Sequence, residues 1–250
     1  MNLKDIREEA WEWADDTAEE DADRLWTLAE MNRYINRIYR RIASETLCIQ
    51  DNNTPAVCRI SSDPVDYTTF TDITSDDYIW ANTEGMWLYH KDVAPYLYAL
   101  HPSILKIDEV KWTIRQWKLT RVNSRKWQTN PYWEQVVGLP TEYATDLKTG
   151  FLALNFRSEI SDIMKLVVRR MPLEKLVKDS DTPEFRTSYH EFFLNGVLSL
   201  MYQKQDSQCF DGDKVKFYEE KFLLDLDEIK QQESQLMQTL GSNGSMDAFR

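Results

Sequence analysis

The chain has 250 residues, with 30 lysines and arginines against 42 aspartates and glutamates, and a formal net charge of −12. Its length allows one large domain or two modest ones, and a hydrophobic content of 42% is too high for a disordered chain. With no run of about 18 apolar residues and no basic segment followed by an apolar core at its start, we expect neither a membrane-spanning helix nor a secretory signal. The excess of acidic residues argues against a general nucleic-acid binder. It is compatible with a surface past which DNA slides without being bound.

The N-terminal part is predicted to be helical. Apolar residues repeat at helical spacing from Leu3 to about Asp16, which indicates a first helix. Residues 15–23 then carry six acids and no base, and are interpreted as a solvated turn or an acidic rim. A second helix is predicted to begin after Thr27, because Glu30 lies three residues later at capping-box spacing, and to end near Leu47.

The distribution of proline divides the chain into three parts. All eight prolines lie between Pro55 and Pro183, and proline breaks helix interiors. We therefore predict an α+β fold: an antiparallel bundle formed by N- and C-terminal helices, with a β-rich insertion between them. The expected domains are residues 1–54 with 177–240 for the bundle, 55–176 for the insertion, and 241–250 for a flexible tail.

Within the insertion, alternating patterns predict strands. Residues 56–61 alternate, and residues 105–119 are expected to form one long strand with a bulge between Ile114 and Trp117. Residues 151–156 follow a Thr-Gly turn signal, and residues 163–169 are expected to be their partner strand. A short helix is predicted over residues 93–101.

The C-terminal part returns to helical spacing. Residues 181–184, Asp-Thr-Pro-Glu, are interpreted as a helix start, and Asp211 is expected to cap a last helix of about seven turns. After it comes a tether rich in glycine and serine that ends in Met246 and Phe249. Such a tether is either disordered or folds on binding.

No pattern of catalysis or metal binding is evident. There is no glycine-rich phosphate loop, His90, His101 and His190 have no metal-ligand spacing, and the acids around Gly212 lack the other ligands of a calcium loop. Cys48, Cys58 and Cys209 are too few and too widely spaced for a disulfide framework or a zinc cluster, and are expected to be partly buried thiols. We expect no enzyme activity, no cofactor and no metal.

Residues 106–126 interleave basic side chains with Trp112 and Trp117. The pattern fits a strand with tryptophans inward and charges outward, a stacking platform for single strands, or a basic face that meets an acidic neighbour. The tryptophans also leave open a carbohydrate- or host-binding module, and the many acids leave open a cytosolic carboxylate-based hydrolase.

Three segments together resemble the head-to-tail adaptor, or connector, proteins of tailed bacteriophages. Residues 24–46, RLWTLAEMNRYINRIYRRIASET, are similar to the early helix of that family. Residues 150–176 resemble its β-hairpin and the Arg-x-Pro element that ends it, here Arg170-Met171-Pro172. Residues 181–222 resemble its late helix pair with a Tyr-His-Glu step, here Tyr189-His190-Glu191.

The resemblance implies a structural virion protein that forms a ring, commonly twelve-fold, between the capsid portal and the tail. Its partners would be the portal protein, tail or further neck proteins and other copies of itself. Duplex DNA would pass through transiently without specific binding, and no membrane would be involved. The protein would assemble in the host bacterial cytoplasm and reside at the head–tail junction of the virion. The family has no catalytic residues to carry over.

Two sets of interaction residues are expected. By position, the C-terminal segment that reaches the portal corresponds to Leu236, Leu240, Met246 and Phe249. Head-to-tail contacts in a ring need two unlike faces, and the charge distribution offers an acidic strip and a basic strip. The acidic strip contains Asp15, Asp16, Glu19 and Glu20, and the basic strip contains Lys111, Arg115, Lys118 and Arg121.

Overall fold

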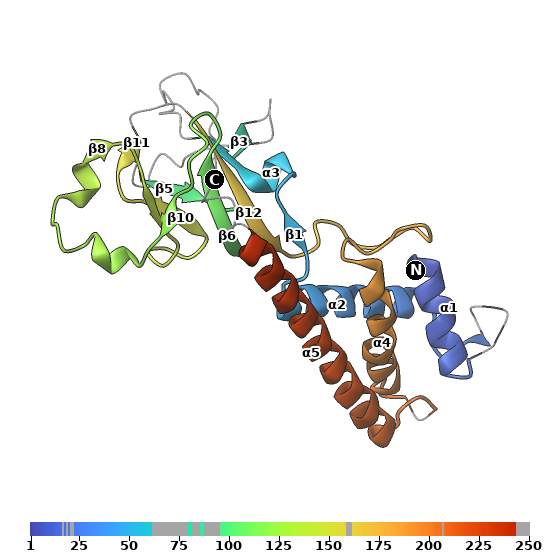
Figure 1. Ribbon diagram of the computed structural model, residues 1–250. Coiled ribbons are helices and arrows are strands. Elements are labelled where there is room, and N and C mark those ends of the chain that lie inside the picture. The colour runs from blue at the N-terminus through green and yellow to red at the C-terminus, as the bar shows by residue number, and fades with distance from the viewer. Residues whose placement is uncertain are drawn as a thin grey trace. The chain divides into compact units, whose positions relative to one another are not determined.

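The computed structural model describes residues 1–16, 18, 20, 23–61, 80–81, 86–87, 96–158, 162–206 and 208–243 (Figure 1). The chain divides into two compact units. Residues 1–49 and 171–250 form the first, called here the helical unit, and residues 50–170 form the second, called the β unit. The predicted fold class is confirmed: the N-terminal helices contact the C-terminal helices, and the sheets come between them in the sequence.

The helical unit is built from four α-helices and a 3-10 helix in its described residues. They are α1 (Leu3–Trp13), α2 (Leu28–Thr46), η5 (Thr187–Phe192), α4 (Phe193–Tyr202) and α5 (Gly212–Asn243). The predicted capping box of α2 is confirmed, because the Thr27 side chain accepts from the Glu30 N–H and the Glu30 carboxylate accepts from the Thr27 N–H. The helix ends at Leu47, which adopts a left-handed φ of 56°.

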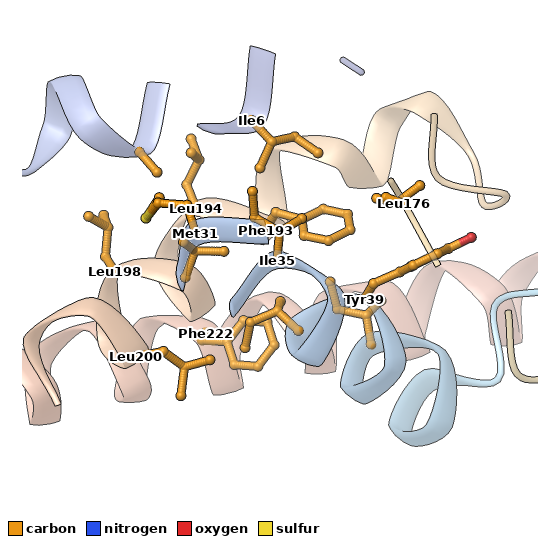
Figure 2. Close-up of a cluster of buried hydrophobic side chains, with 14 of the residues drawn as sticks. Ile6, Met31, Ile35, Tyr39, Leu176, Phe193, Leu194, Leu198, Leu200 and Phe222 are labelled. Atoms are coloured by element: carbon orange, nitrogen blue, oxygen red, sulfur yellow. The ribbon is translucent and has the colours of Figure 1, made fainter. Parts of the chain in front are cut away.

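The core of the helical unit lies where α2, α4 and α5 meet (Figure 2). Helix α2 contributes Met31 and Ile35, α4 contributes Phe193, and α5 contributes Phe222, all fully buried. Gly196 allows α4 to come close to its neighbours. A Cβ atom at this position would lie 3.0 Å from side-chain atoms of both Ile38 and Phe222. The absence of a side chain at residue 196 therefore sets the spacing of the three helices.

The predicted helix start at residues 181–184 is wrong. The Asp181 carboxylate accepts from the N–H groups of Val177 and Lys178, both at 2.8 Å, and the Glu184 carboxylate accepts from the Leu173 N–H at 3.0 Å. These acids therefore close a loop that precedes the helix, and helical structure begins only at Thr187. The predicted cap of the last helix is confirmed, since Asp211 accepts from the Asp213 and Lys214 N–H groups at 3.1 Å.

Two helix ends also differ from the sequence-based expectation. Helix α1 ends at Trp13, short of the predicted Asp16, and Asp15 has a left-handed φ of 57° that a continuing helix does not permit. Helix α5 continues through Gly241, Ser242 and Asn243, the first residues of the predicted tail. Residues 244–250 lie outside the described part of the chain.

In its described residues, the β unit contains one short α-helix, two 3-10 turns and several strands. The helices are α3 (Pro55–Cys58) and the 3-10 turns η3 (Ser124–Lys126) and η4 (Trp133–Gln135). The strands are β1 (Gln50–Asp51), β2 (Arg59–Ser61), β3 (Trp80–Ala81), β4 (Met86–Trp87), β5 (Leu97–Ala99), β6 (Ile104–Trp112), β7 (Thr120–Arg121), β8 (Val137–Gly138), β9 (Glu142–Ala144), β10 (Phe151–Leu154), β11 (Arg157–Ser158) and β12 (Ile163–Arg170).

The strands form three sheets. One has the order β1-β12-β2-β4-β3, with β6 also pairing antiparallel with β12, and a second has the order β5-β10-β9-β7. Strands β8 and β11 form a two-stranded parallel pair. The β unit has its own core between the first two sheets, which includes Val110, Trp112, Leu152 and Leu166.

Several sequence predictions for this unit are wrong. The predicted long strand over residues 105–119 folds back on itself: β6 ends at Trp112, Gln116 has a φ of 60°, and Lys118 bridges antiparallel to Lys111. The alternation of apolar and polar residues over 105–119 therefore continues across a hairpin turn. An alternating pattern alone does not show whether the strand has a bulge or turns back at such a point.

Three further assignments are corrected. Residues 56–58 of the first predicted strand belong to the helix α3, because Pro55 supplies a helix N-terminus. Strands β10 and β12 belong to different sheets, so residues 151–156 and 163–169 are not partners. Within the predicted helix over residues 93–101, Leu97–Ala99 is the strand β5, paired with β10, while residues 93–95 lie outside the described part.

Candidate interaction surfaces

The acidic strip follows α1, and its members have different environments. Asp15 and Glu20 are exposed, whereas Asp16 is buried and its carboxylate accepts from the Trp26 N–H at 3.3 Å. Arg24 donates to the Asp16 carbonyl at 3.0 Å. Asp16 therefore contacts the residues just before α2, and Glu19 lies outside the described residues.

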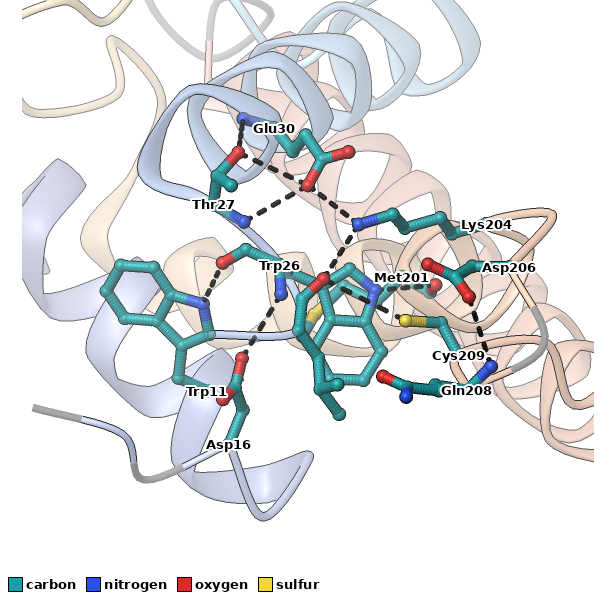
Figure 3. A network of polar contacts seen from close by, with 11 residues as sticks. Trp11, Asp16, Trp26, Thr27, Glu30, Met201, Lys204, Asp206, Gln208 and Cys209 are labelled. Atoms are coloured by element: carbon teal, nitrogen blue, oxygen red, sulfur yellow. Dashed lines mark hydrogen bonds and ion pairs between the residues drawn. The ribbon is translucent and has the colours of Figure 1, made fainter. Parts of the chain in front are cut away.

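A tryptophan network anchors this loop to α4 (Figure 3). The Trp11 ring N–H donates to the Trp26 carbonyl at 3.0 Å, and the Trp26 ring N–H donates to the Met201 carbonyl at 2.8 Å. Both indoles are buried. Because both indole N–H groups have a partner, Trp26, just before α2, is held against the end of α1 and the end of α4.

Lys204 adds a charged contact to the same network. Its ammonium lies 3.1 Å from the Glu30 carboxylate and donates to the Leu25 carbonyl at 2.7 Å. Burial alone would raise the pKa of Glu30, but Lys204 and the Thr27 hydrogen bonds outweigh burial and lower it. Lys204 thus ties the start of α2 to the end of α4.

The basic strip lies on β6, the following turn and β7. Lys111 is half-buried, Lys118 pairs with Glu109 at 2.9 Å, and Arg121 donates to the Thr145 hydroxyl at 3.3 Å. Arg115 is exposed and lies 5.5 Å from the Trp117 ring centre. The acidic strip belongs to the helical unit and the basic strip to the β unit.

The two tryptophans of this region differ in position. Trp112 is fully buried, and its ring N–H donates to the Pro140 carbonyl at 3.3 Å. Trp117 is 37% exposed. Trp112 is therefore a core residue, as one reading of the sequence expected, and it cannot stack on a sugar or a base at the surface.

Arg170 of the Arg-x-Pro element forms a buried ion pair with Asp51. Its Nε lies 2.6 Å from the Asp51 carboxylate, and both side chains are less than one-tenth exposed. Burial by itself raises the pKa of Asp51, but hydrogen bonds from Thr54, Asn53 and Arg170 lower it well below its usual range. The pair joins β1 to β12 at the edge of the β unit.

The expected portal-docking residues lie at the end of the chain. Leu236 is half-buried on α5. Leu240 lies on the same helix, and its side chain is outside the described part, as are Met246 and Phe249. Their role in docking stays a prediction.

A cationic groove runs along α2. It has a volume of about 530 Å³ and is called here the α2 groove. Its lining consists of Asn32, Arg33, Asn36, Arg37, Arg40, Lys175, Leu176 and Val177. The spacing of residues 33, 37 and 40 places the three arginines on one side of α2. This local spacing does not reveal that residues 175–177 form the opposite wall.

Among the described residues, no group of three or more histidine, cysteine or carboxylate side chains could hold a metal ion. His190 is buried and shares a hydrogen bond with the Phe185 carbonyl at 3.2 Å, and burial lowers its pKa. All three cysteines are buried thiols. No helix found in the described residues has the length and apolarity needed to cross a bilayer.

Comparison with known proteins gives one family. A family model described as SU10 adaptor protein matches residues 1–244 of the chain. No curated protein matches the sequence.

Proposed function

The chain belongs to the SU10 adaptor protein family and is a phage adaptor protein, and from this premise we propose that it forms a ring joining the capsid portal to the tail. The match over residues 1–244, which includes both units, carries the proposal. We propose a structural role at the head–tail junction of the virion, without catalysis. Its partners would be the portal protein, tail or further neck proteins and further copies of the chain, with twelve copies as the expected number.

The charge of the chain supports a place beside the DNA channel. A net charge of −12 on each subunit is multiplied around a ring, and phosphate groups are repelled by such a wall. A genome could then pass without being held.

The acidic and basic strips support contacts between neighbouring subunits. Asp15 and Glu20 on the helical unit, and Arg115, Lys118 and Arg121 on the β unit, are exposed and of opposite charge. Lys111 is half-buried and Asp16 is buried, so within the two strips these two are the weaker candidates. Each pair contributes little in salt, but a ring repeats each contact.

The portal contact is proposed for the end of α5 and the residues after it: Leu236, Leu240, Met246 and Phe249. Deleting residues 241–250 should leave the helical unit folded, because the buried part of α5 extends only to Glu233 in the described side chains. The deletion should weaken binding to the portal protein, measured by co-sedimentation of purified portal rings with the full-length and truncated chains. Unfolding of the truncated chain, or unchanged portal binding, would contradict this assignment.

A further inference from the structure

We propose that the outer face of α5 in one copy binds the α2 groove of the next copy. This inference rests on the proposed ring and assigns one of its subunit contacts to residues that the sequence did not identify. The outer face is defined here by Phe217, Glu220, Leu224, Asp227 and Glu228, and is called the α5 stripe. The partner of the cationic groove is thus an acidic and apolar helix of a second copy of this chain.

The α2 groove presents positive charge beside apolar surface. Among the described residues, Arg37, Arg40 and Lys175 have no acidic partner, although the chain as a whole is strongly acidic. Val177, on the opposite wall, is 72% exposed. A ligand that fits both features carries carboxylates next to aliphatic or aromatic side chains, which favours a protein surface over bare phosphates.

The walls of the groove are fixed before any partner binds. Asn36 is hydrogen-bonded through its amide to both the N–H and the carbonyl of Leu176, each at 2.9 Å. Arg7 donates to Asn32 at 3.0 Å and to Asp179 at 2.9 Å, which holds one end of the same wall. A preorganised groove loses less entropy on binding than one that must form.

The α5 stripe has the complementary composition. Successive members of the stripe are three, four, three and one residues apart. They therefore share one side of the helix, opposite the core residues Phe222, Leu226 and Ile229. Phe217 is 50% exposed and Leu224 is 70% exposed. Glu220, Asp227 and Glu228 supply negative charge beside them, while Lys230 lies 3.1 Å from Asp227 and the Lys221 ammonium lies 4.3 Å from the Phe217 ring centre. Exposed aromatic and aliphatic residues with carboxylates between them offer the mixed surface that a basic groove with an apolar wall can bind.

The two surfaces lie on different sides of the helical unit. Arg41 holds α5 against α2, with its guanidinium 2.7 Å from Glu219. At 3.6 residues per turn, the groove residues Asn36 and Arg40 lie about 140° and about 100° around α2 from Arg41, and Arg37 lies about 40° from it. The α5 stripe in turn faces away from the core. A surface on one side that fits a surface on another side gives head-to-tail contacts, and these can close a ring.

Charge reversal with rescue tests the pairing. Full-length protein is mixed with portal rings, and the mass of the assembly is measured. Arg37→Glu with Arg40→Glu should reduce the fraction of subunits in rings by about tenfold or more, as the loss of complementary charge implies. Adding Glu220→Arg with Glu228→Arg to the same chain should restore rings. Arg59→Glu with Arg157→Glu, two exposed arginines of the β unit, is the matched control and should leave rings unchanged.

Cross-linking gives a second readout that does not depend on charge. Val177→Cys and Leu224→Cys together should give a ladder of covalent multimers under mild oxidation, since every subunit then offers one thiol to each neighbour. Either change alone should give monomers, because the natural cysteines are buried. Dimers from Leu224→Cys alone would show that α5 packs on itself, and would overturn the proposal.

The outcomes separate this inference from the proposed function. Rings that form equally well after Arg37→Glu with Arg40→Glu would overturn the groove contact and leave the adaptor ring intact. Intact rings that lose affinity for duplex DNA would show that the groove meets phosphates instead, which also overturns the contact. Wild-type protein that never forms a ring with the portal would overturn the proposed function, and this inference with it.

Discussion

Asn36 on α2 and Leu176, 140 residues later, are joined by a pair of hydrogen bonds that the Asn36 side chain makes to the Leu176 backbone. The amide donates to the carbonyl and accepts from the N–H, as a neighbouring strand would. The same amide nitrogen donates to the Asn32 carbonyl at 2.8 Å. One side chain thus fastens the segment that follows β12 to the helix that carries the α2 groove.

Asn36→Ala should lower the free energy of unfolding by about 2 kcal/mol, because it removes these bonds and leaves the polar groups of Leu176 without their partner. Denaturant unfolding followed by circular dichroism would measure the change. Gln205→Ala, an exposed residue of the same unit, should change the free energy by less than about 0.5 kcal/mol. Equal effects of the two substitutions would refute the role assigned to Asn36.

Asp16 and Glu20 belong to one acidic strip but should respond differently to substitution. Asp16→Ala should destabilise the protein by about 1–2 kcal/mol, since it leaves the buried Trp26 N–H without an acceptor. Glu20→Ala should be nearly neutral in the isolated chain, because Glu20 is exposed. Thermal unfolding of both variants measures the difference. Equal stability of Asp16→Ala and Glu20→Ala would contradict the structural role assigned to Asp16.

Gly196→Ala should destabilise the helical unit although alanine favours helix formation. The new methyl group would lie 3.0 Å from Ile38 and Phe222, and overpacking of this kind costs about 1–3 kcal/mol. Gly212→Ala is the control, because its methyl group would meet the Phe210 ring at an ordinary 3.7 Å. The midpoints of urea unfolding should fall for residue 196 and not for residue 212. A more stable Gly196→Ala variant would contradict the described packing.

His190 should make the stability of the helical unit depend on pH. Burial lowers its folded-state pKa below the ordinary value of 6.5, so the unfolded state binds the proton more readily. The stabilising contribution is therefore complete above about pH 6.5 and decreases as the pH falls from there toward the folded-state pKa.

Unfolding free energies at about pH 7.5 and about pH 5 would show this loss, and His190→Gln should reduce it. His101, whose pKa is also lowered by burial, accounts for part of what remains. If the loss of unfolding free energy between about pH 7.5 and about pH 5 is the same in His190→Gln as in the unchanged chain, His190 is not its source.

Local signals predicted the helical unit better than the β unit. The caps at Thr27 and Asp211 need only neighbouring residues, and both are confirmed. The partner of β12 could not be read from the sequence, because alternation shows which side of a strand is apolar and not which strand lies beside it. The start signal at residues 181–184 failed for a similar reason, since Asp181 bonds to a loop that precedes it.

The interaction surfaces were predicted only in part. The acidic strip was evident as a run of charge, yet the burial of Asp16 depends on Trp26, which packs against α4 some 175 residues away in sequence. The α2 groove likewise needs residues 175–177 to lie against α2, a long-range contact that no local pattern encodes. The division into domains at residues 54 and 177 stays a prediction that limited proteolysis can test.

Single-particle electron microscopy of the virion tests the central claim most directly. The account predicts a closed ring of density, fitted by this chain, between the portal and the tail, with the α5 stripe of each subunit in the α2 groove of the next. Density for the chain at another place in the particle, or a single copy at the junction, would contradict it.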